Sequence, residues 1–386
     1  MKKQTRLLTA GRDPEANFGI VNPPVYHAST VLFPSVAALR EATSNRYDSV
    51  YYGLLGTPTT FALQEAIAEL EGYPQAVAVP SGLAAIVAAL LAFLKNGDHL
   101  LMTDSTYGPT RRFCDGLLKG FGVETTYYDP MIGAGISTLM RPETKVVFTE
   151  APGSLTFEIQ DIPAICKAAH AGGAKVIFDN TWSAGVYLCA PDMGVDVSVQ
   201  AVTKYIGGHA DLMLGSIAMS DEDNMTIRST VTELGYGAAP DDCFLALRGL
   251  RSMNARLPIH QENALKLANW LDQRPEVARV LHPALPSCPG HEFWKRDFTG
   301  SSGLFGFVLK EEFTDTHVAA MLDHMDLFAM GYSWGGYESL IVPYGTTPPR
   351  TASPWSSGQL IRIHAGQEAV SDLIEDLEAA FVRLNA

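Results

Sequence analysis

From about residue 60, the chain alternates short apolar runs rich in β-branched residues with amphipathic stretches of helical length. The apolar runs are AVAVP at Ala76, HLLMT at His99, KVVFTE at Lys145, KVIFDN at Lys175 and DVSVQA at Asp196. Helical stretches such as TTFALQEAIAELEG and DIPAICKAAHAGG lie before or between them and end in glycine. This alternation predicts an α/β fold, with helices on both faces of a mostly parallel sheet. Polar residues after the strands should then meet at the carboxyl edge of that sheet.

The rhythm changes after about Leu250. A helix from Ile259 to Leu271, a long polar loop, the strand FGFVLK and a closing helix predict a smaller α+β domain over residues 251–386, after an α/β domain over residues 56–250. The first 55 residues have little periodicity. We predict that residues 1–55 form an arm that contacts a neighbouring subunit, and a loose terminus is the alternative.

Charge and cysteine content limit the partners. The 28 Lys and Arg against 42 Asp and Glu give a net charge of -14, which would repel nucleic acid and anionic membrane, so we expect neither as a partner. The five cysteines are scattered without zinc-type spacing, which predicts no metal site and suits a reducing cytoplasm. The start of the chain has no apolar leader, and the longest apolar run, from Leu83 to Leu94, is too short to span a bilayer.

Lys204 has unusual surroundings for a lysine. It directly follows the apolar run DVSVQAVT and precedes YIGGHAD, whose paired glycines allow a ligand to approach the backbone. A lysine that forms a Schiff base must lose its proton well below its free pKa, and burial after a strand favours that loss. Lys204 is therefore the candidate carrier of pyridoxal phosphate (PLP), in an enzyme that acts on an amino acid.

Further residues fit the same cofactor. Asp179 ends the strand KVIFDN, where a carboxylate could pair with a protonated pyridine nitrogen, although a strand-end turn cap is the alternative. Gly82 and Leu83 open a helix after the strand AVAVP, where free N–H groups bind phosphate, and Thr203 could add a hydroxyl. Glycine at such a turn is also common without a ligand.

One further residue is a candidate contact to the cofactor ring, and another is a candidate contact to the substrate. Tyr107 follows the strand HLLMTDS, where its ring could stack on the cofactor. Arg362 lies within the apolar strand LIRIHAG, where a guanidinium needs a carboxylate. A substrate α-carboxylate would supply it, and a structural salt bridge is the alternative.

These segments together resemble the Cys/Met-metabolism family of PLP enzymes. The resemblance runs from about residue 15 to the end and includes FALQEAIAELEG, GDHLLMTDSTYGP, DNTWSAGV, QAVTKYIGGHAD, YSWGGYESL and LIRIHAG. It implies a fold type I PLP enzyme, typically a homotetramer in which dimers share active sites. It also implies β-elimination of L-cystathionine to homocysteine, pyruvate and ammonia.

The resemblance assigns a role to each candidate residue. It implies Lys204 as the Schiff-base lysine, Asp179 as the pyridine partner and Tyr107 as the stacking ring. The implied phosphate contacts are Gly82, Leu83, Thr203 and, from a neighbouring subunit, Tyr52. The implied α-carboxylate clamp is Arg362 with Ser333 and Trp334, and Ser333 and Tyr107 would steer the proton of the lysine.

The chain departs from the family beside the expected site. Leu54 and Leu55 stand where close relatives have arginines, which removes a charge-assisted hydrogen bond to phosphate, about 1.5–3 kcal/mol. Arg112 stands where β-lyase relatives have an acidic residue near the distal amino group, so it is a candidate substrate contact. Alternatively, Arg111 and Arg112 are solvated charges on a helix turn.

These departures leave neighbouring functions open. Within the family they are γ-lyase, γ-synthase, cysteine desulfhydrase and alanine racemase activity, and an inactive binding or regulatory relative is a further alternative. The segment GYSWG, from Gly331 to Gly335, also matches the G-x-S-x-G pattern of serine hydrolases. A strand-like sequence follows it where the hydrolase pattern requires a helix, which argues against a hydrolase.

Overall fold

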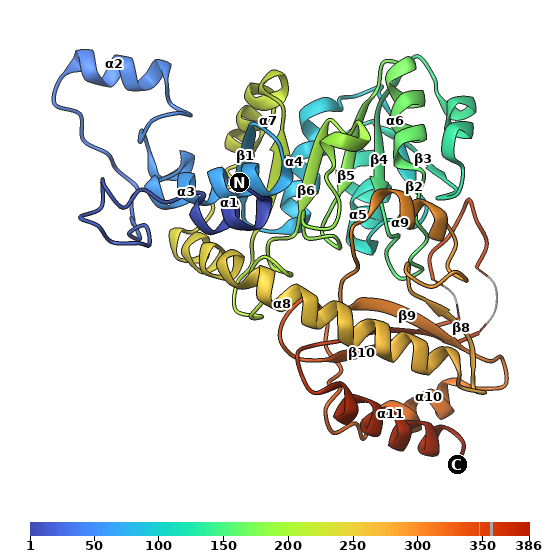
Figure 1. The fold of residues 1–386 in the computed structure, drawn as a ribbon. Coiled ribbons are helices and arrows are strands. Elements are labelled where there is room, and N and C mark those ends of the chain that lie inside the picture. Colours follow the sequence, from blue (N-terminus) through green and yellow to red (C-terminus); the bar gives the residue numbers. More distant parts are fainter. Residues whose placement is uncertain (347, 356–357) are drawn as a thin grey trace.

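The centre of the molecule is a seven-stranded sheet (Figure 1) in a computed structural model that describes residues 1–346, 348–355 and 358–386. The strand order is β1-β7-β6-β5-β4-β2-β3. The strands are β1 (Gln75–Val79), β2 (His99–Thr103), β3 (Glu124–Tyr128), β4 (Thr144–Glu150), β5 (Lys175–Asp179), β6 (Val197–Gln200) and β7 (Gly215–Met219). Neighbours among β2 to β6 are parallel, whereas β7 is antiparallel to β6 and β1.

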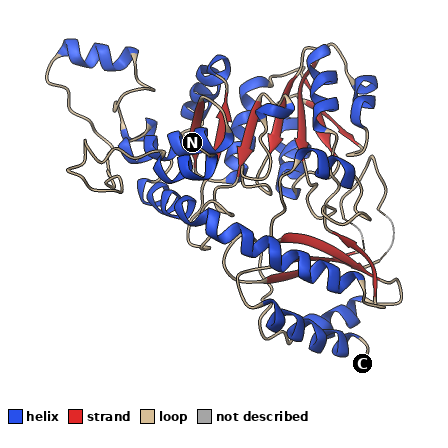
Figure 2. Cartoon of the chain, in the orientation of Figure 1, coloured by secondary structure: helices blue, strands red, loops and turns tan. Residues whose placement is uncertain are grey.

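Helices cover both faces of this sheet (Figure 2). The helices in this part of the chain are α1 (Lys3–Thr9), α2 (Val36–Ser44), α3 (Pro58–Glu71), α4 (Gly82–Phe93), α5 (Gly108–Phe113), α6 (Ile162–Ala171), α7 (Asp221–Glu233) and α8 (Pro240–Asp272), and of these α2 lies away from the sheet (Figure 1). Strand residues alternate between the two faces: Val176 and Phe178 pack with α3 and α6, whereas Ile177 packs with α4. The prediction of a mostly parallel sheet with helices on both faces is confirmed.

The strand pattern missed β3 and β7. The edge strand β3 has the sequence ETTYY and is only partly buried, so it lacks the continuous apolar run of its neighbours. The strand β7, with the sequence GSIAM, is fully buried but begins with two small residues. In both cases tertiary pairing, rather than residue type, stabilises the strand.

The rest of the chain forms a smaller, antiparallel sheet in the order β10-β11-β9-β8. Its elements are β8 (Val277–Leu281), α9 (His291–Asp297), β9 (Leu304–Leu309), α10 (Asp315–Leu322), β10 (Leu340–Gly345), β11 (Leu360–His364) and α11 (Val370–Leu384). Apolar residues of α10, α11 and the end of α8 cover one face of it. The sequence predicts this smaller α+β unit at the place where it lies, after the larger sheet in chain order.

Helix α8 runs diagonally from the large sheet to the small one (Figure 1). The helix predicted from Ile259 is therefore only its second half. Gly249 and Pro258, which disfavour helix in the sequence, both lie inside α8. Gly249 is required by packing, because a Cβ there would lie 2.2 Å from the carbonyl oxygen of Ile206. The predicted boundary at residue 250 falls within this helix, and the division into three segments stays a prediction.

Residues before α3 include a segment that stands away from the body of the molecule, with α2 at its far end (Figure 1). Several apolar side chains on it face solvent in the single chain, among them Phe18 at 99% and Leu32 at 89% exposure. Such a set of exposed apolar residues is typical of a protein contact surface. Of the helices that the structure describes, none has the length and apolar character that a bilayer crossing requires.

Candidate active site

Polar side chains gather at the carboxyl edge of the large sheet. Asp179 ends β5, and Glu150 ends β4 directly beside it in the strand pairing. Tyr107 follows β2, and Lys204 follows β6 by four residues. Because these strands are parallel, their carboxyl ends lie at one edge. The structure therefore collects three of the predicted residues at the place where ligands bind in open α/β sheets.

The Lys204 amine points at a segment from the second part of the chain. Its Nζ donates to Ser333 Oγ at 2.6 Å and lies 5.2 Å from the centroid of the Trp334 ring. Burial and, to a lesser extent, the nearby charge of Arg362 lower the pKa of Lys204 to about 8, against the opposing effect of Asp179. The neutral form of this amine is therefore much more accessible near neutral pH than that of an ordinary lysine.

The segment that carries Ser333 has a constrained backbone. Ser333 has φ +87°, a conformation that costs a non-glycine residue about 1–3 kcal/mol. Its carbonyl oxygen accepts a hydrogen bond from Arg362 Nη2 at 3.2 Å. Gly335 packs on the main chain of Lys204, where a Cβ would lie 2.9 Å from the Lys204 carbonyl carbon. These contacts hold the hydroxyl of Ser333 against the amine.

Asp179 and Glu150 form a pair of buried carboxyl groups. Asp179 Oδ1 accepts hydrogen bonds from the Thr181 backbone N–H at 3.0 Å and from its hydroxyl at 2.5 Å. Burial raises the pKa of Asp179, and burial together with the charge of Asp179 raises the pKa of Glu150 well above its usual range. Of the two, Asp179 is the better anion, because Lys204 favours its ionised form.

Glu150 also positions Tyr107. Its Oε2 accepts hydrogen bonds from the Tyr107 backbone N–H at 2.8 Å and from the Thr106 hydroxyl at 3.3 Å. Sequence reasoning missed Glu150. The available signal was its place at the end of KVVFTE, which matches that of Asp179 in the next strand. Burial raises the pKa of the Tyr107 phenol, which is consequently neutral.

Arg362 lies in the middle of β11 and is 9% exposed. Besides its bond to Ser333, the guanidinium carbon lies 5.4 Å from the centroid of the Tyr344 ring. Within the described ranges no carboxylate forms an ion pair with it, so a structural salt bridge does not explain this arginine. Burial lowers its pKa, but a guanidinium is basic enough to keep its positive charge in a protein. The arrangement can bind an anion beside Lys204.

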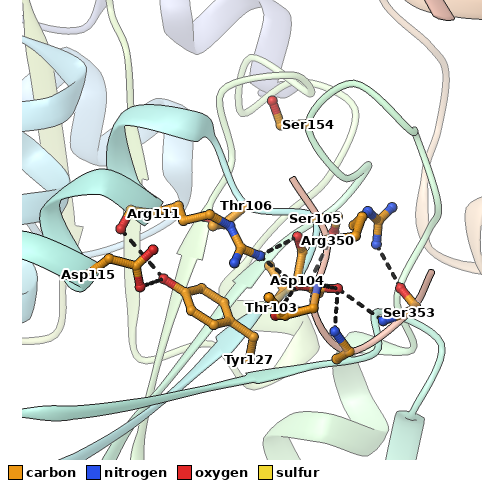
Figure 3. A network of polar contacts seen from close by, with 12 residues as sticks. Thr103, Asp104, Ser105, Thr106, Arg111, Asp115, Tyr127, Ser154, Arg350 and Ser353 are labelled. Atoms are coloured by element: carbon orange, nitrogen blue, oxygen red, sulfur yellow. Dashed lines mark hydrogen bonds and ion pairs between the residues drawn. The ribbon is translucent and has the colours of Figure 1, made fainter. Parts of the chain in front are cut away.

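Arg111 and Arg112 have different surroundings, and Figure 3 shows those of Arg111. Arg111 is buried, donates to Asp104 Oδ1 at 2.5 Å, and lies 3.7 Å from the centroid of the Tyr127 ring. The interpretation of Arg111 as a solvated charge is therefore wrong, because Asp104 pairs with it inside the molecule. Arg112 is exposed, and its charge opposes the rise in the pKa of Tyr107, so it lies at the mouth of the site.

Asp104 also binds the loop between β10 and β11. Its carboxylate accepts backbone N–H groups from three consecutive residues, Thr351, Ala352 and Ser353, at 2.8–3.0 Å (Figure 3). These bonds, with the Arg111 bond, hold the pKa of Asp104 below its usual value despite burial. Nearby, Arg350 donates to Thr156 and Glu158, which ties the same loop to the large sheet.

The start of α4 packs directly against the Lys204 loop. A Cβ on Gly82 would lie 2.5 Å from Cβ of Ala201, so only glycine fits there. Ser81 caps the helix through a hydrogen bond from the Ala84 N–H at 3.1 Å, which leaves the N–H groups of Gly82 and Leu83 at the helix start for a ligand.

The two other expected phosphate contacts are Thr203 and Tyr52. The Thr203 hydroxyl donates to the Leu214 carbonyl at 3.1 Å and accepts from its N–H at 2.9 Å. Tyr52 precedes a short 3-10 helix (Gly53–Leu55) and is 47% exposed. No contact among the described residues joins Tyr52 to the Lys204 cluster. Its assignment remains a prediction that requires a second subunit.

The serine-hydrolase alternative fails on geometry. Ser333 Oγ accepts from the Lys204 amine, and strand β10 follows the motif instead of a helix. The neighbouring imidazole of His364 bonds with Gly335 N and Gly336 O. In the part of the chain that the structure describes, Ser333 therefore has no histidine base.

Comparisons with known proteins agree on one family. A family model described as Cys/Met metabolism PLP-dependent enzyme matches residues 4–382. The chain is 46% identical to cystathionine β-lyase MetC of Escherichia coli, over 99% of both chains. It is 40% identical to an L-alanine/L-glutamate racemase of Wolbachia pipientis, over 100% of this chain and 98% of that protein. The crystal structure of metB from Corynebacterium glutamicum superposes with a TM-score of 0.92 at 29% identity, covering 100% and 98% of the two chains.

Proposed function

This chain belongs to the Cys/Met metabolism family of PLP-dependent enzymes, and from that membership we propose that it cleaves L-cystathionine by β-elimination to homocysteine, pyruvate and ammonia. The predictions of the family, of an enzyme and of PLP as its cofactor are confirmed. The 46% identity to the β-lyase of Escherichia coli supports the substrate and the bond that breaks. The reaction would serve methionine biosynthesis.

The observation that carries the proposal is the grouping of Lys204, Ser333 and Arg362. A buried amine with a lowered pKa donates to a hydroxyl, and the backbone of that same serine is bound by a buried guanidinium without a carboxylate partner in the described chain. An amino-acid substrate has the complementary groups, an α-carboxylate for Arg362 and an acidic Cα–H for the amine.

The residues around Lys204 fit PLP. The buried Asp179 carboxylate would hold the proton on the ring nitrogen, and the neutral Tyr107 phenol would lie against the ring. The phosphate would take the N–H groups of Gly82 and Leu83, at a helix start that admits only glycine. Thr203 and a partner subunit's Tyr52 are further proposed phosphate contacts. When bound, PLP supplies an electron sink for the Cα of an amino acid.

The protein itself moves the protons. Arg362, with Ser333 and Trp334 beside it, orients the substrate through its α-carboxylate. The neutral Lys204 amine then accepts the proton from Cα, and Ser333 Oγ holds that amine in position. The bond from Cβ to sulfur breaks, and the ammonium of Lys204 returns the proton to the departing thiolate. Tyr107 would help to steer this transfer, because its phenol faces the same space.

The proposed assembly is a homotetramer of dimers with shared active sites, in the cytoplasm. It is supported by the exposed apolar residues of the N-terminal segment, including Phe18 and Leu32. Tyr52, at the end of that segment, would then reach the phosphate of a neighbouring subunit. Leu54 and Leu55 would contribute no charge there, so the phosphate would rely on main-chain N–H groups. Light scattering of the purified protein measures the assembly directly.

The first experiment tests the cofactor site. The purified protein should show the visible absorbance of bound PLP, and borohydride should fix the cofactor to Lys204, as peptide mapping would show. In the variant K204A, borohydride should fix no cofactor to the protein. A wild-type protein in which borohydride labels a different lysine would contradict the assignment of Lys204.

The second experiment separates the family reactions. Incubation with L-cystathionine should release pyruvate and homocysteine in equal amounts, and K204A is the control. Release of 2-oxobutyrate without pyruvate would overturn β-elimination. Conversion of L-alanine to D-alanine without cleavage of cystathionine would instead favour a racemase, and no turnover of any of these amino acids would favour an inactive relative.

A further inference from the structure

Tyr344 lies beside the proposed carboxylate clamp and has no role in the function described so far. It belongs to β10, and the pairing of β10 with β11 shifts register between Pro343 and Gly345. Tyr344 therefore has no residue directly opposite it, and Gly345 has φ +68°. Such β-bulges commonly re-aim a side chain next to a functional site. Here the ring of Tyr344 lies against Arg362 next to this bulge, on the face of β10 that Val342, the partner of Arg362, also occupies.

The ring of Tyr344 occupies one side of the Arg362 guanidinium, whose Cζ lies 5.4 Å from the ring centroid. This distance is within the range of a cation–π contact. The phenols of Tyr344, Tyr107 and Tyr332 raise the pKa of Arg362, and Lys204 is the nearby cation whose pKa Arg362 lowers. Burial raises the pKa of the Tyr344 phenol, so this neighbour is neutral. Among the described residues, the Arg362 guanidinium thus has neutral rings and one carbonyl oxygen as neighbours and forms no ion pair with a carboxylate.

The distinction matters because a carboxylate on Arg362 would compete with a substrate carboxylate. Arg111 illustrates such competition, since the Asp104 carboxylate already binds its guanidinium. A ring against the guanidinium stabilises the charge without using the N–H groups that a carboxylate needs. The bond to the Ser333 carbonyl uses only Nη2.

We propose that Tyr344 is a positioning residue of the carboxylate site: its ring holds the Arg362 guanidinium and keeps the N–H edge available to the α-carboxylate of an amino-acid substrate. The inference rests on the proposed role of Arg362. It assigns the effect to the aromatic ring and not to the phenol hydroxyl, which makes Y344F the conservative replacement. It also predicts that Tyr344 affects ligands with a carboxylate and leaves other ligands unaffected.

The test uses the PLP-loaded enzyme and two ligands, L-alanine and L-alaninamide, which lacks the carboxylate. Their dissociation constants are measured from the change in cofactor absorbance. Y344L should weaken L-alanine binding about 3- to 30-fold, the range of a cation–π contact, and leave L-alaninamide unchanged. Y344F should bind both ligands like the wild type. Y337L is the matched control on the same segment, since Tyr337 is 51% exposed, and it should change neither constant.

Several results would overturn the proposal. They are equal weakening of both ligands by Y344L, unchanged L-alanine binding by Y344L, or Y344F binding L-alanine as weakly as Y344L. If Y344L does not fold, as judged by its melting temperature and PLP content, Y344M replaces it under the same criteria. The variant R362A separates a failure of the Arg362 assignment from a failure of the Tyr344 assignment. If R362A keeps the wild-type preference for L-alanine over L-alaninamide, the role of Arg362 is wrong. If R362A loses this preference and Y344L keeps it, only the role of Tyr344 is wrong.

Discussion

Two of the four buried arginines of the described chain, Arg111 and Arg362, have surroundings that differ in one chemical respect. Arg111 lies under the loop between β10 and β11, and its charge is matched by the fully buried carboxylate of Asp104. Arg362 lies in β11 beside Lys204, and its neighbours are a carbonyl oxygen and aromatic rings. A buried charge is costly unless polar groups compensate it, and Arg362 has one hydrogen-bond acceptor among the described residues, which leaves its other N–H groups for a ligand. The comparison supports the proposals that Arg111 stabilises the fold and that Arg362 binds substrate.

The largest effect should come from removing the unpaired arginine. R362A should lower kcat/KM for L-cystathionine about a thousandfold, since a bidentate bond to a buried carboxylate is worth about 4 kcal/mol. The melting temperature should stay level or rise, because no internal carboxylate loses its partner. Steady-state kinetics and thermal unfolding measure the two effects. A stability loss as large as that of an Arg111 variant would remove the distinction.

The paired arginine should show the reverse. R111A leaves Asp104 buried with one partner fewer, which should destabilise the protein by about 3 kcal/mol. Urea unfolding of the apo-protein, followed by tryptophan fluorescence, measures the midpoint. D104N is the companion variant and should also be destabilised, because the N–H groups of Thr351 to Ser353 bind the carboxylate. Unchanged midpoints in both variants would contradict a structural role for the pair.

A smaller effect concerns the pH dependence of Lys204. Burial, with the charge of Arg362, lowers the pKa of Lys204 from 10.5 to about 8. Uptake of PLP by the apo-protein should therefore rise with pH and level off above about pH 8. R362Q should move this midpoint to higher pH, whereas R111Q should leave it in place. Absorbance-monitored uptake across the pH range measures it, and equal midpoints in R362Q and wild type would contradict the electrostatic contact.

The same lowered pKa has a consequence for stability. Between about pH 8 and 10.5 the unfolded chain binds more protons at Lys204 than the folded chain does, so the folded apo-protein gains stability as pH rises through this window. Below pH 8 both states are protonated and the burial cost is fully present. Comparison of apo wild type with K204M isolates this contribution, and parallel pH profiles of the two proteins would disprove it.

The smallest effect should come from the exposed neighbour, Arg112. R112A should change KM for L-cystathionine by a few fold and leave the melting temperature unaltered, because exposed charges contribute about 0–1 kcal/mol. The effect should shrink in high salt, as expected for a charge at the mouth of a site. Kinetics at two ionic strengths measure it. A hundredfold loss of kcat would mean that Arg112 takes part in the chemistry itself.

Much of the fold could be predicted because its signals are local. The runs that became β2, β4, β5 and β6 are continuous apolar segments, and the helices between them end in glycine. Prediction failed where packing overrules local preference. Gly249 and Pro258 lie inside α8, and the partly polar β3 is stabilised by its pairing with β2.

The site was predicted unevenly for a similar reason. Lys204, Asp179 and Tyr107 follow strands, so their common edge follows from the parallel sheet. Glu150 was missed, although it ends the strand next to Asp179. Tyr344 could not be predicted, because the pairing of β10 with β11, and not a motif, brings it beside Arg362.

The sequence by itself determined the sheet, the lysine after its sixth strand and the glycine at the start of α4. Each of these depends on the order of residues along a short segment. Only the tertiary structure decided which arginine is paired, because the groups that surround Arg111 and Arg362 come from distant parts of the chain. Asp104 binds residues about 250 positions away, and Lys204 meets Ser333 across 129 positions. Charge pairing acts through space, so neighbouring arginines with the same local sequence, Arg111 and Arg112, have opposite environments.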